Sequence, residues 1–254
     1  MRIAGAVRVV ASAAACGVLL TTLTSCGGDG NDGAKKSGAA KRSAAAQGHA
    51  SKGHAEPPTT GLKRIPDVGD RLQSQIPADS RQVVAVYGAG KNSADSTVVL
   101  YTKSRSTWDK VAGWKGHNGK KGWTADHHEN DKRSPVGVFT LSDAGGVLAD
   151  PGARLPYTRT PSIQAPHYWP KTHWHDFDYV IAIDYNRVKG TPPNDPTRPQ
   201  GQTKGGSIWL HMDHGSGTSA CVSVSKEAME KLLRTLDPKQ HPVVVMGDRA
   251  SLRA

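Results

Sequence analysis

The chain has 254 residues, of which 33 are Lys or Arg and 22 are Asp or Glu, giving a formal net charge of +11. This length suits one globular domain with additional terminal segments. The basic balance favours an anionic partner such as a cell wall or a bilayer surface, and nucleic acid is excluded as a partner because no recognition motif is visible.

The first 25 residues have the composition of an export signal. An apolar run of small residues extends to Leu23, and it is preceded by Met1, Arg2 and Arg8. The run closes with Leu-Thr-Ser before Cys26, which resembles the bacterial lipobox, where the cysteine is diacylated and begins the mature protein. We therefore expect residues 1–25 to be a lipoprotein signal peptide and Cys26 to carry the lipid; an ordinary cleaved signal is the alternative.

Gly, Ala, Ser, Lys and His dominate the next segment, and apolar residues do not recur in it periodically. Such a composition cannot bury enough surface to fold, so residues 26–61 are predicted to be a flexible tether, with a reach of roughly 30 to 35 Å. The protein is accordingly expected in the cell envelope, held by its lipid on the outer face of the cytoplasmic membrane. Residues 62–254 are expected to form its domain.

The segments with strong strand propensity are short, rich in β-branched or aromatic residues, and separated by Gly, Pro, Asn and Asp. They are 82–87, 97–102, 136–141, 179–185, 207–211 and 243–246. The Pro- and His-rich passage 150–177 is predicted to be an irregular excursion, and excursions of that length are often functional.

One stretch, 226–236, is predicted to be a helix. Ser225 is its candidate N-cap, Glu227 lies near its positive N-terminal end, and an apolar face contains Met229, Leu232, Leu233 and Leu236. Mostly strands with one late helix indicate a mainly β fold, a β-sandwich-like domain with the C-terminal helix packed on it.

Cysteine usage singles out one thiol. Cys16 leaves with the signal peptide and Cys26 would carry the lipid, so Cys221 remains without a disulfide partner in the expected mature protein. Exported proteins usually pair their cysteines, so an unpaired one is either a small buried hydrophobe or a nucleophile.

The surroundings of Cys221 favour a nucleophile. His211 ends the strand 207–211, a Gly-rich loop follows, and the chain returns through Cys221 towards the helix. Two adjacent strands joined as a hairpin would bring the imidazole within hydrogen-bond reach of the sulfur. Thiol acyl transfer needs such a base, because the thiolate is the nucleophile. The backbone N–H groups of Ser219 and Ala220, in the turn before the thiol, are candidates to stabilise the oxyanion.

These residues resemble the signature of the L,D-transpeptidase catalytic domain family (YkuD type), in which a strand ends in a catalytic histidine and Ser/Thr-His-Gly-Cys follows. By position, His211 matches the family's base, Thr218 its Ser/Thr and Cys221 its acylated nucleophile. The segment 134–141 is similar to the family's Thr-Pro-x-Gly-x-Phe strand, and 179–186 and 236–247 are similar to its short-loop branch. The resemblance covers residues 108–247.

The resemblance implies a peptidoglycan L,D-transpeptidase that acts on tetrapeptide stems through a Cys221 thioester and forms cell-wall cross-links. It implies that the carbonyl of Met212 orients the His211 ring, and that no cofactor is needed. The expected partners are stem peptides and, through the lipid, the membrane, and a monomer is expected. An L,D-carboxypeptidase with the same acyl-enzyme and a non-catalytic wall-binding lipoprotein are the alternatives.

Three positions depart from the family pattern. Ser219 and Ala220 replace His-Gly before the cysteine, and Ser223 replaces Arg or Asn after it. Alanine can replace glycine only where the backbone does not need a positive φ. Because the backbone N–H groups remain, these changes bear on efficiency and acceptor choice more than on the reaction class.

The chain has 11 histidines, which raises the alternative of a metal-dependent hydrolase. None has the His-Glu-x-x-His spacing of a zinc peptidase, and the groups at 127–128, 173–175 and 211–214 lie in loops with no sign of convergence, so no metal is expected. His128, His214, Thr218 and Trp123 are candidates to line a substrate cleft. For residues 127–128 and 173–177, packing under long loops is the ordinary alternative. His214 is more simply expected to be solvated. Trp209 is expected to pack in the core.

Overall fold

The computed structural model describes residues 59–254, which belong to one compact unit of the chain, His54–Ala254. The predicted signal peptide, the predicted lipidation site Cys26 and the predicted tether up to residue 58 lie outside the described residues. The first β-bridge of the described part joins Leu62 to Trp108. The boundary at residue 61 stays a prediction.

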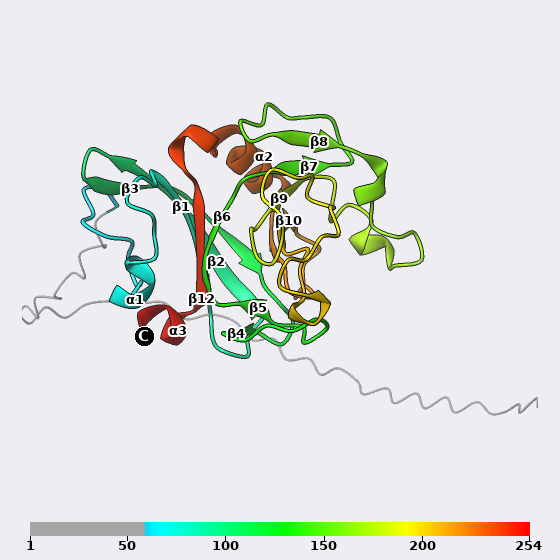
Figure 1. Ribbon diagram of the computed structural model, residues 1–254, viewed down its shortest axis with the longest axis horizontal. Coiled ribbons are helices and arrows are strands. Elements are labelled where there is room, and N and C mark those ends of the chain that lie inside the picture. The colour runs from blue at the N-terminus through cyan, green and yellow to red at the C-terminus, as the bar shows by residue number, and fades with distance from the viewer. Residues whose placement is uncertain (1–58) are drawn as a thin grey trace, which may run out of the picture. The chain divides into compact units, whose positions relative to one another are not determined.

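Ten strands form one mixed sheet, and two more, β4 (Trp123–Thr124) and β5 (Ser134–Pro135), form a separate pair (Figure 1). In spatial order the ten strands are β6 (Gly137–Thr140), β12 (Val243–Asp248), β1 (Gln82–Gly88), β2 (Asp95–Ser104), β3 (Thr107–His117), β11 (Val222–Val224), β10 (Trp209–Met212), β9 (Val180–Ala182), β7 (Ala144–Gly146) and β8 (Tyr157–Arg159). The strands that come first in the chain therefore lie at the centre of the sheet.

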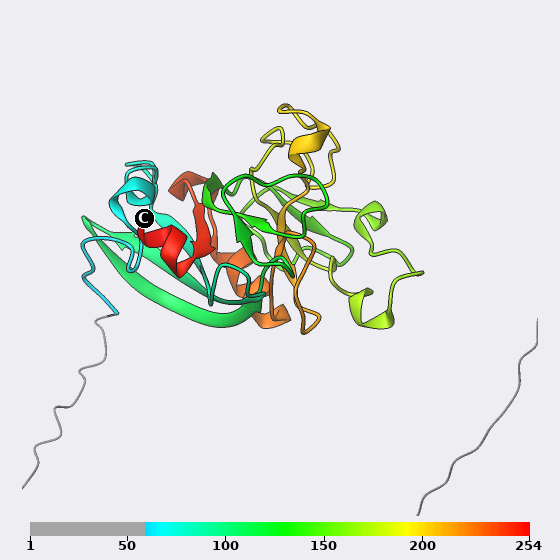
Figure 2. The same cartoon turned by 90° about the horizontal axis from the view of Figure 1, so that it is seen from below.

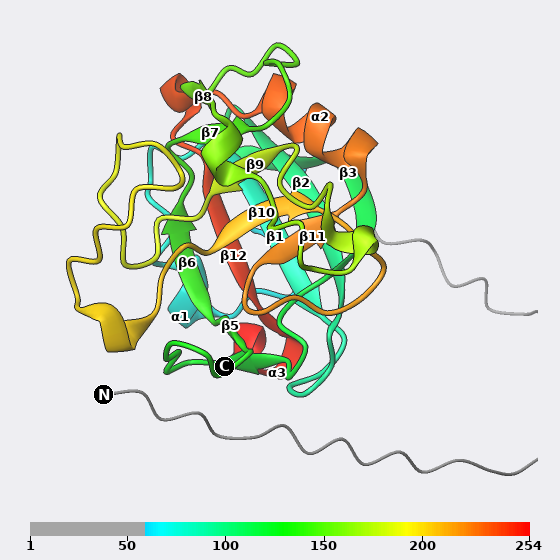
Figure 3. The same ribbon diagram turned by 90° about the vertical axis from the view of Figure 1, so that its right-hand side faces the viewer.

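The sheet bends so that its two halves face each other across the main core. Val84 of β1 and Met246 of β12 belong to the same buried cluster as Ile181 of β9, Leu210 of β10 and Val222 of β11. Figure 3 shows β10 and β11 crossing in front of β1, β2 and β12. The structure thus confirms the predicted mainly β, sandwich-like fold.

The predicted helix is α2 (Lys226–Thr235), which confirms the prediction for 226–236 to within one residue. The side chain of Ser225 caps it by accepting a hydrogen bond from the N–H of Ala228. Its apolar face, which includes Met229 and Leu232, is fully buried in the main core. Burial of that face holds α2 on the sheet, because a helix this short is marginal alone.

Two shorter helices were not predicted. α1 (Asp70–Gln73) and α3 (Arg249–Arg253) lie close together, as Figure 2 shows. They bury Leu72 and Leu252 in a second cluster with Val83 and Val245, on the outer face of β1 and β12. Within residues 59–254, no helix is both long and apolar enough to cross a membrane.

Each of the six predicted strands is present, with ends that differ by up to three residues. The long central strand β3 was not predicted, because it carries charged residues and its exposed face interrupts the apolar pattern. It is held by its pairing with β2 along nearly its whole length. The passage 150–177 is irregular apart from β8 and the two 3-10 turns η1 (Pro161–Ile163) and η2 (Lys171–His173).

β10 and β11 run parallel, so the prediction of a hairpin was wrong. Leu210 pairs with Val222, and His211 pairs with Ser223. The other edge of β11 pairs antiparallel with the end of β3, which sets its direction. The loop 213–221 therefore crosses from the end of β10 back to the beginning of β11, a difference that local sequence patterns do not encode.

Candidate active site

The parallel pairing places His211 and Cys221 on one face of the sheet. His211 lies beside Ser223 in the register, and Cys221 precedes Ser223 by two residues. Since side chains alternate along a strand, these residues share a face. Leu210, Val222 and Val224 point the other way, into the main core.

The thiol of Cys221 is half-buried, and β10 and its preceding residues hold it by two contacts. The backbone N–H of Trp209 donates to Sγ over 3.3 Å, and the thiol donates to the carbonyl of Ser207 over 3.6 Å. Among the described residues no hydrogen bond joins Sγ to the His211 ring, so the predicted contact is not formed in this structure. Burial raises the pKa of Cys221 to about 11, so the thiol is protonated at neutral pH.

His211 is 2% exposed and has a defined tautomer. Its Nδ1 lies 2.7 Å from the carbonyl oxygen of Met212. A carbonyl can only accept, so Nδ1 carries the hydrogen and Nε2 keeps a lone pair in the neutral ring. Burial lowers the pKa of His211, although the charge of Asp176 opposes that effect. The ring is therefore neutral at pH 7 and able to accept a proton.

Two hydroxyl groups fix the turn that precedes the thiol. Ser134 Oγ donates to the carbonyl of Ala220 over 2.6 Å, and Thr218 Oγ1 donates to the carbonyl of Cys221 over 2.6 Å. Within residues 59–254, the backbone N–H groups of Ser219 and Ala220 find no acceptor. Ala220 is not among the described residues with positive φ, so the loss of glycine there does not strain the backbone.

A cavity of about 580 Å³ borders the thiol, and both Cys221 and His211 line it. Thr218 and Ser219 also contribute to its wall. A smaller cavity of about 90 Å³ shares three lining residues with the first one, namely Ser207, Ser219 and Cys221. Cys221 therefore lies in the walls of both cavities.

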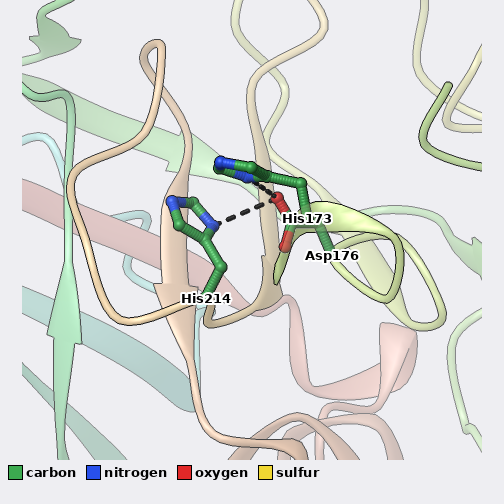
Figure 4. Close-up of side chains that lie close together, drawn as sticks. All are labelled: His173, Asp176 and His214. Atoms are coloured by element: carbon green, nitrogen blue, oxygen red, sulfur yellow. Dashed lines mark hydrogen bonds and ion pairs between the residues drawn. The ribbon is translucent and has the colours of Figure 1, made fainter. Parts of the chain in front are cut away.

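The larger cavity also contains a cluster that the sequence analysis missed (Figure 4). Nδ1 of His173 lies 2.9 Å, and Nδ1 of His214 lies 3.1 Å, from the same oxygen of Asp176, so the expectation that these histidines do not converge was wrong. The side chain of His214 is 4% exposed, so it is not solvated as expected. The contact with the carboxylate raises the pKa of His214, against the effect of burial.

A contact between backbones brings this cluster together. The N–H of Met212 donates to the carbonyl of Asp176 over 3.0 Å, which ties the turn 173–176 to the end of β10. The spacing His-x-x-Asp at 173–176 was the available signal, since it puts both side chains on one turn. The approach of His214 depends on the tertiary contact and has no local signal.

Two predicted cleft residues do not line either cavity. Trp123 is 1% exposed and packs in the main core, so it cannot contact a substrate. His128 lies on the surface near Asp126, whereas its neighbour His127 is buried and lines the smaller cavity. Trp209 is buried as expected, and its indole N–H donates to the carbonyl of Pro193.

Ser223, a departure from the family pattern, anchors the start of the loop. Its Oγ donates to Asp213 over 2.6 Å, and Asp213 also contacts Nδ1 of His117 in β3 over 2.8 Å. Although burial raises the pKa of the Asp213 carboxyl, these two hydrogen bonds hold that pKa below its usual range. An ionised Asp213 thus joins β3, β11 and the loop.

Comparison with known proteins shows a match to one protein family. A model described as the L,D-transpeptidase catalytic domain (YkuD) matches residues 91–245. No curated protein matches the chain. The solved structure of Bdellovibrio bacteriovorus Bd1075 is 15% identical with a TM-score of 0.39, and the match covers 73% of this chain and 51% of that one. The chain therefore spans about half the length of that protein.

Proposed function

Because this chain belongs to the L,D-transpeptidase catalytic domain family, we propose that it is a cysteine acyltransferase that acts on the tetrapeptide stems of peptidoglycan. The observation that carries the proposal is the placement of Cys221 and His211 on one face of adjacent strands, in the wall of one cavity. A nucleophile and a base so placed are the two groups that thiol acyl transfer requires.

In the first half-reaction, Nε2 of His211 takes the proton of the Cys221 thiol while Sγ attacks the carbonyl between the third stem residue and the terminal D-alanine. The C–N bond breaks, the imidazolium returns its proton to the leaving amine, and a thioester remains on Cys221. The free N–H groups of Ser219 and Ala220 are proposed to stabilise the oxyanion, a contribution of about 3 kcal/mol per donor.

In the second half-reaction, the amine of a neighbouring stem attacks the thioester and loses its proton to His211, which releases the Cys221 thiol and completes the cross-link. The presence of Cys221 in the walls of both cavities supports a transfer between two substrates. Water in place of the amine would make the same acyl-enzyme an L,D-carboxypeptidase.

The resting site is neutral, because burial raises the pKa of the thiol to about 11 and lowers that of the imidazole. An ion pair of Cys221 and His211 is therefore rare before substrate binds. We propose that a bound stem peptide displaces the thiol from the Ser207 carbonyl and turns it towards Nε2 of His211. Catalytic hydrogen bonds that are absent from an empty site often form only in the substrate complex.

A non-catalytic wall-binding protein of the same fold is the second candidate. The missing hydrogen bond between the thiol and His211, together with the Ser219 and Ala220 departures, favours it. The two candidates differ in one outcome, which is whether a covalent adduct forms.

The test is intact-mass analysis after incubation of the full chain with a carbapenem or with a tetrapeptide stem. We expect an adduct of one acyl group in the wild type and none in Cys221→Ala. Ser219→Ala is the matched control, because it keeps the backbone N–H and should keep the adduct. A folded wild-type protein that stays unmodified by both reagents would refute the catalytic proposal and favour the wall-binding one.

We also propose that the protein is a lipoprotein, diacylated at Cys26 and held on the outer face of the cytoplasmic membrane. The support is the order of charged, apolar and small residues before Cys26. Incorporation of labelled fatty acid into the wild type and not into Cys26→Ala is the expected result. Equal labelling of both chains, or of neither, would contradict the assignment.

A further inference from the structure

His173, Asp176 and His214 form a compact donor set that the proposed acyl transfer does not use. One oxygen of Asp176 lies 2.9 Å from Nδ1 of His173 and 3.1 Å from Nδ1 of His214, and the two rings are 4.1 Å apart between centroids. His173 and Asp176 come from the excursion between β8 and β9, and His214 comes from the loop after β10. Two distant parts of the chain thus present three donors to one point.

His214 is the member with a ring nitrogen that is unpartnered within residues 59–254. Its side chain is 4% exposed, yet neither ring nitrogen has a hydrogen bond of acceptable geometry among the described residues. Nδ1 makes an ion pair with Asp176 at 3.1 Å, so Nε2 is the ring nitrogen with neither an ion-pair nor a hydrogen-bond partner in this part of the chain. Buried polar atoms without a partner are rare in folded proteins and call for an explanation, such as an ion.

The chemistry of the set fits a transition-metal ion. Imidazole nitrogen and carboxylate oxygen are ligands of divalent zinc and its neighbours, whose bonds to them are about 2.0–2.2 Å long. In a tetrahedral site such bonds place neighbouring donors about 3.3–3.5 Å apart. The two contacts with Asp176 are a few tenths of an ångström shorter than that, so a small outward movement would admit an ion.

We infer that His173, Asp176 and His214 bind one divalent transition-metal ion of the zinc class in the wall of the larger cavity. All three residues line that cavity, so the fourth position of the ion faces the cavity and takes water. The hydrogen bond from Met212 N–H to the Asp176 carbonyl holds the two ligand-bearing segments together without the ion. The site is therefore largely formed before the ion arrives.

This site is separate from the thiol chemistry, and the inference does not rest on the proposed acyl transfer. The rings of His214 and His211 stack with centroids 6.3 Å apart, and neither Cys221 nor His211 belongs to the donor set. Binding of the ion should therefore persist when Cys221 is replaced. An ion held by the thiol would behave in the opposite way.

The test is calorimetric titration of ZnCl2, and the visible d–d absorption of CoCl2, with the untagged, metal-free full chain. We expect one equivalent bound by the wild type, and the d–d intensity of a four- or five-coordinate cobalt site. His214→Gln and His173→Gln should each weaken binding by about tenfold or more, because the loss of even an outer-shell partner costs about 10- to 100-fold.

His175→Gln is the matched control. His175 pairs with Asp178 over 2.9 Å at the same i,i+3 spacing as His173 with Asp176, but no third ligand from residues 59–254 joins that pair. It and Cys221→Ala should bind zinc as the wild type does, and thermal unfolding of each variant checks that it is folded. Absence of binding by the wild type, unchanged binding by both folded His173 and His214 variants, or loss of binding in Cys221→Ala would each overturn the inference.

Discussion

The thiol of Cys221 should react with a small alkylating reagent more slowly than an ordinary thiol does. Burial raises its pKa from 9.0 to about 11. At any pH below both values, the pKa that is two units higher makes the thiolate, which is the reactive form, about 100-fold rarer. A thiolate of higher pKa is intrinsically more nucleophilic. With a Brønsted coefficient of about 0.4–0.5, a pKa that is two units higher increases the rate constant of the thiolate roughly 6- to 10-fold, which partly offsets its lower population. Alkylation in the folded chain should therefore be about 10- to 15-fold slower than in the unfolded chain.

The assay is alkylation by iodoacetamide at several pH values between 7.5 and 10, followed by mass mapping of the Cys221 peptide, because Cys16 and Cys26 also belong to the chain. The same chain in denaturant is the reference. The rate in the folded protein should rise about tenfold per pH unit through the whole interval. A folded-state rate that levels off near pH 9, as for an ordinary thiol, would refute the reasoning. Simple shielding would lower the rate without changing the pH at which the rate levels off.

Three further variants test other parts of the structure. His211→Ala should slow acylation by about 10²- to 10⁴-fold in single-turnover mass measurements, and unchanged kinetics would remove it as the base. Ser134→Ala should lower the free energy of unfolding in urea by about 2 to 6 kcal/mol, because the Ala220 carbonyl and the Gly119 N–H both lose a buried partner; an effect equal to that of the exposed Ser219→Ala would contradict this. Leu232→Ala on α2 should lower the same free energy by about 2 to 5 kcal/mol and leave the acylation rate of the folded fraction unchanged.

The elements that were predicted from sequence are those whose burial leaves a local pattern. β1 is buried along its whole length and reads as an uninterrupted apolar run, and α2 shows both its cap and its apolar face. β3 gives no such signal, because Lys and Asp occupy its exposed face and pairing with β2 holds it in place. The parallel direction of β11 is likewise a property of its neighbours.

The same distinction applies to the site. Cys221, His211 and the carbonyl of Met212 lie within one short segment, so a motif could identify them together. The cluster at His214 joins residues about 40 positions apart, whose segments are linked by a backbone hydrogen bond from Met212 to Asp176. Trp123 was misplaced because an aromatic residue near a Gly-rich turn has the same local pattern whether it packs inward or lines a cleft.

The parallel pairing of β10 with β11 separates two properties of this protein that a hairpin would have combined. The pairing of the strands fixes His211 and the residue that follows Cys221, whereas His214, Ser216, Gly217 and Thr218 of the connecting loop contribute to the wall of the cavity. A change of side chain at the exposed Ser216 can therefore alter which molecules are accepted while the strand pairing is kept. That position is the natural place for grafting a new specificity.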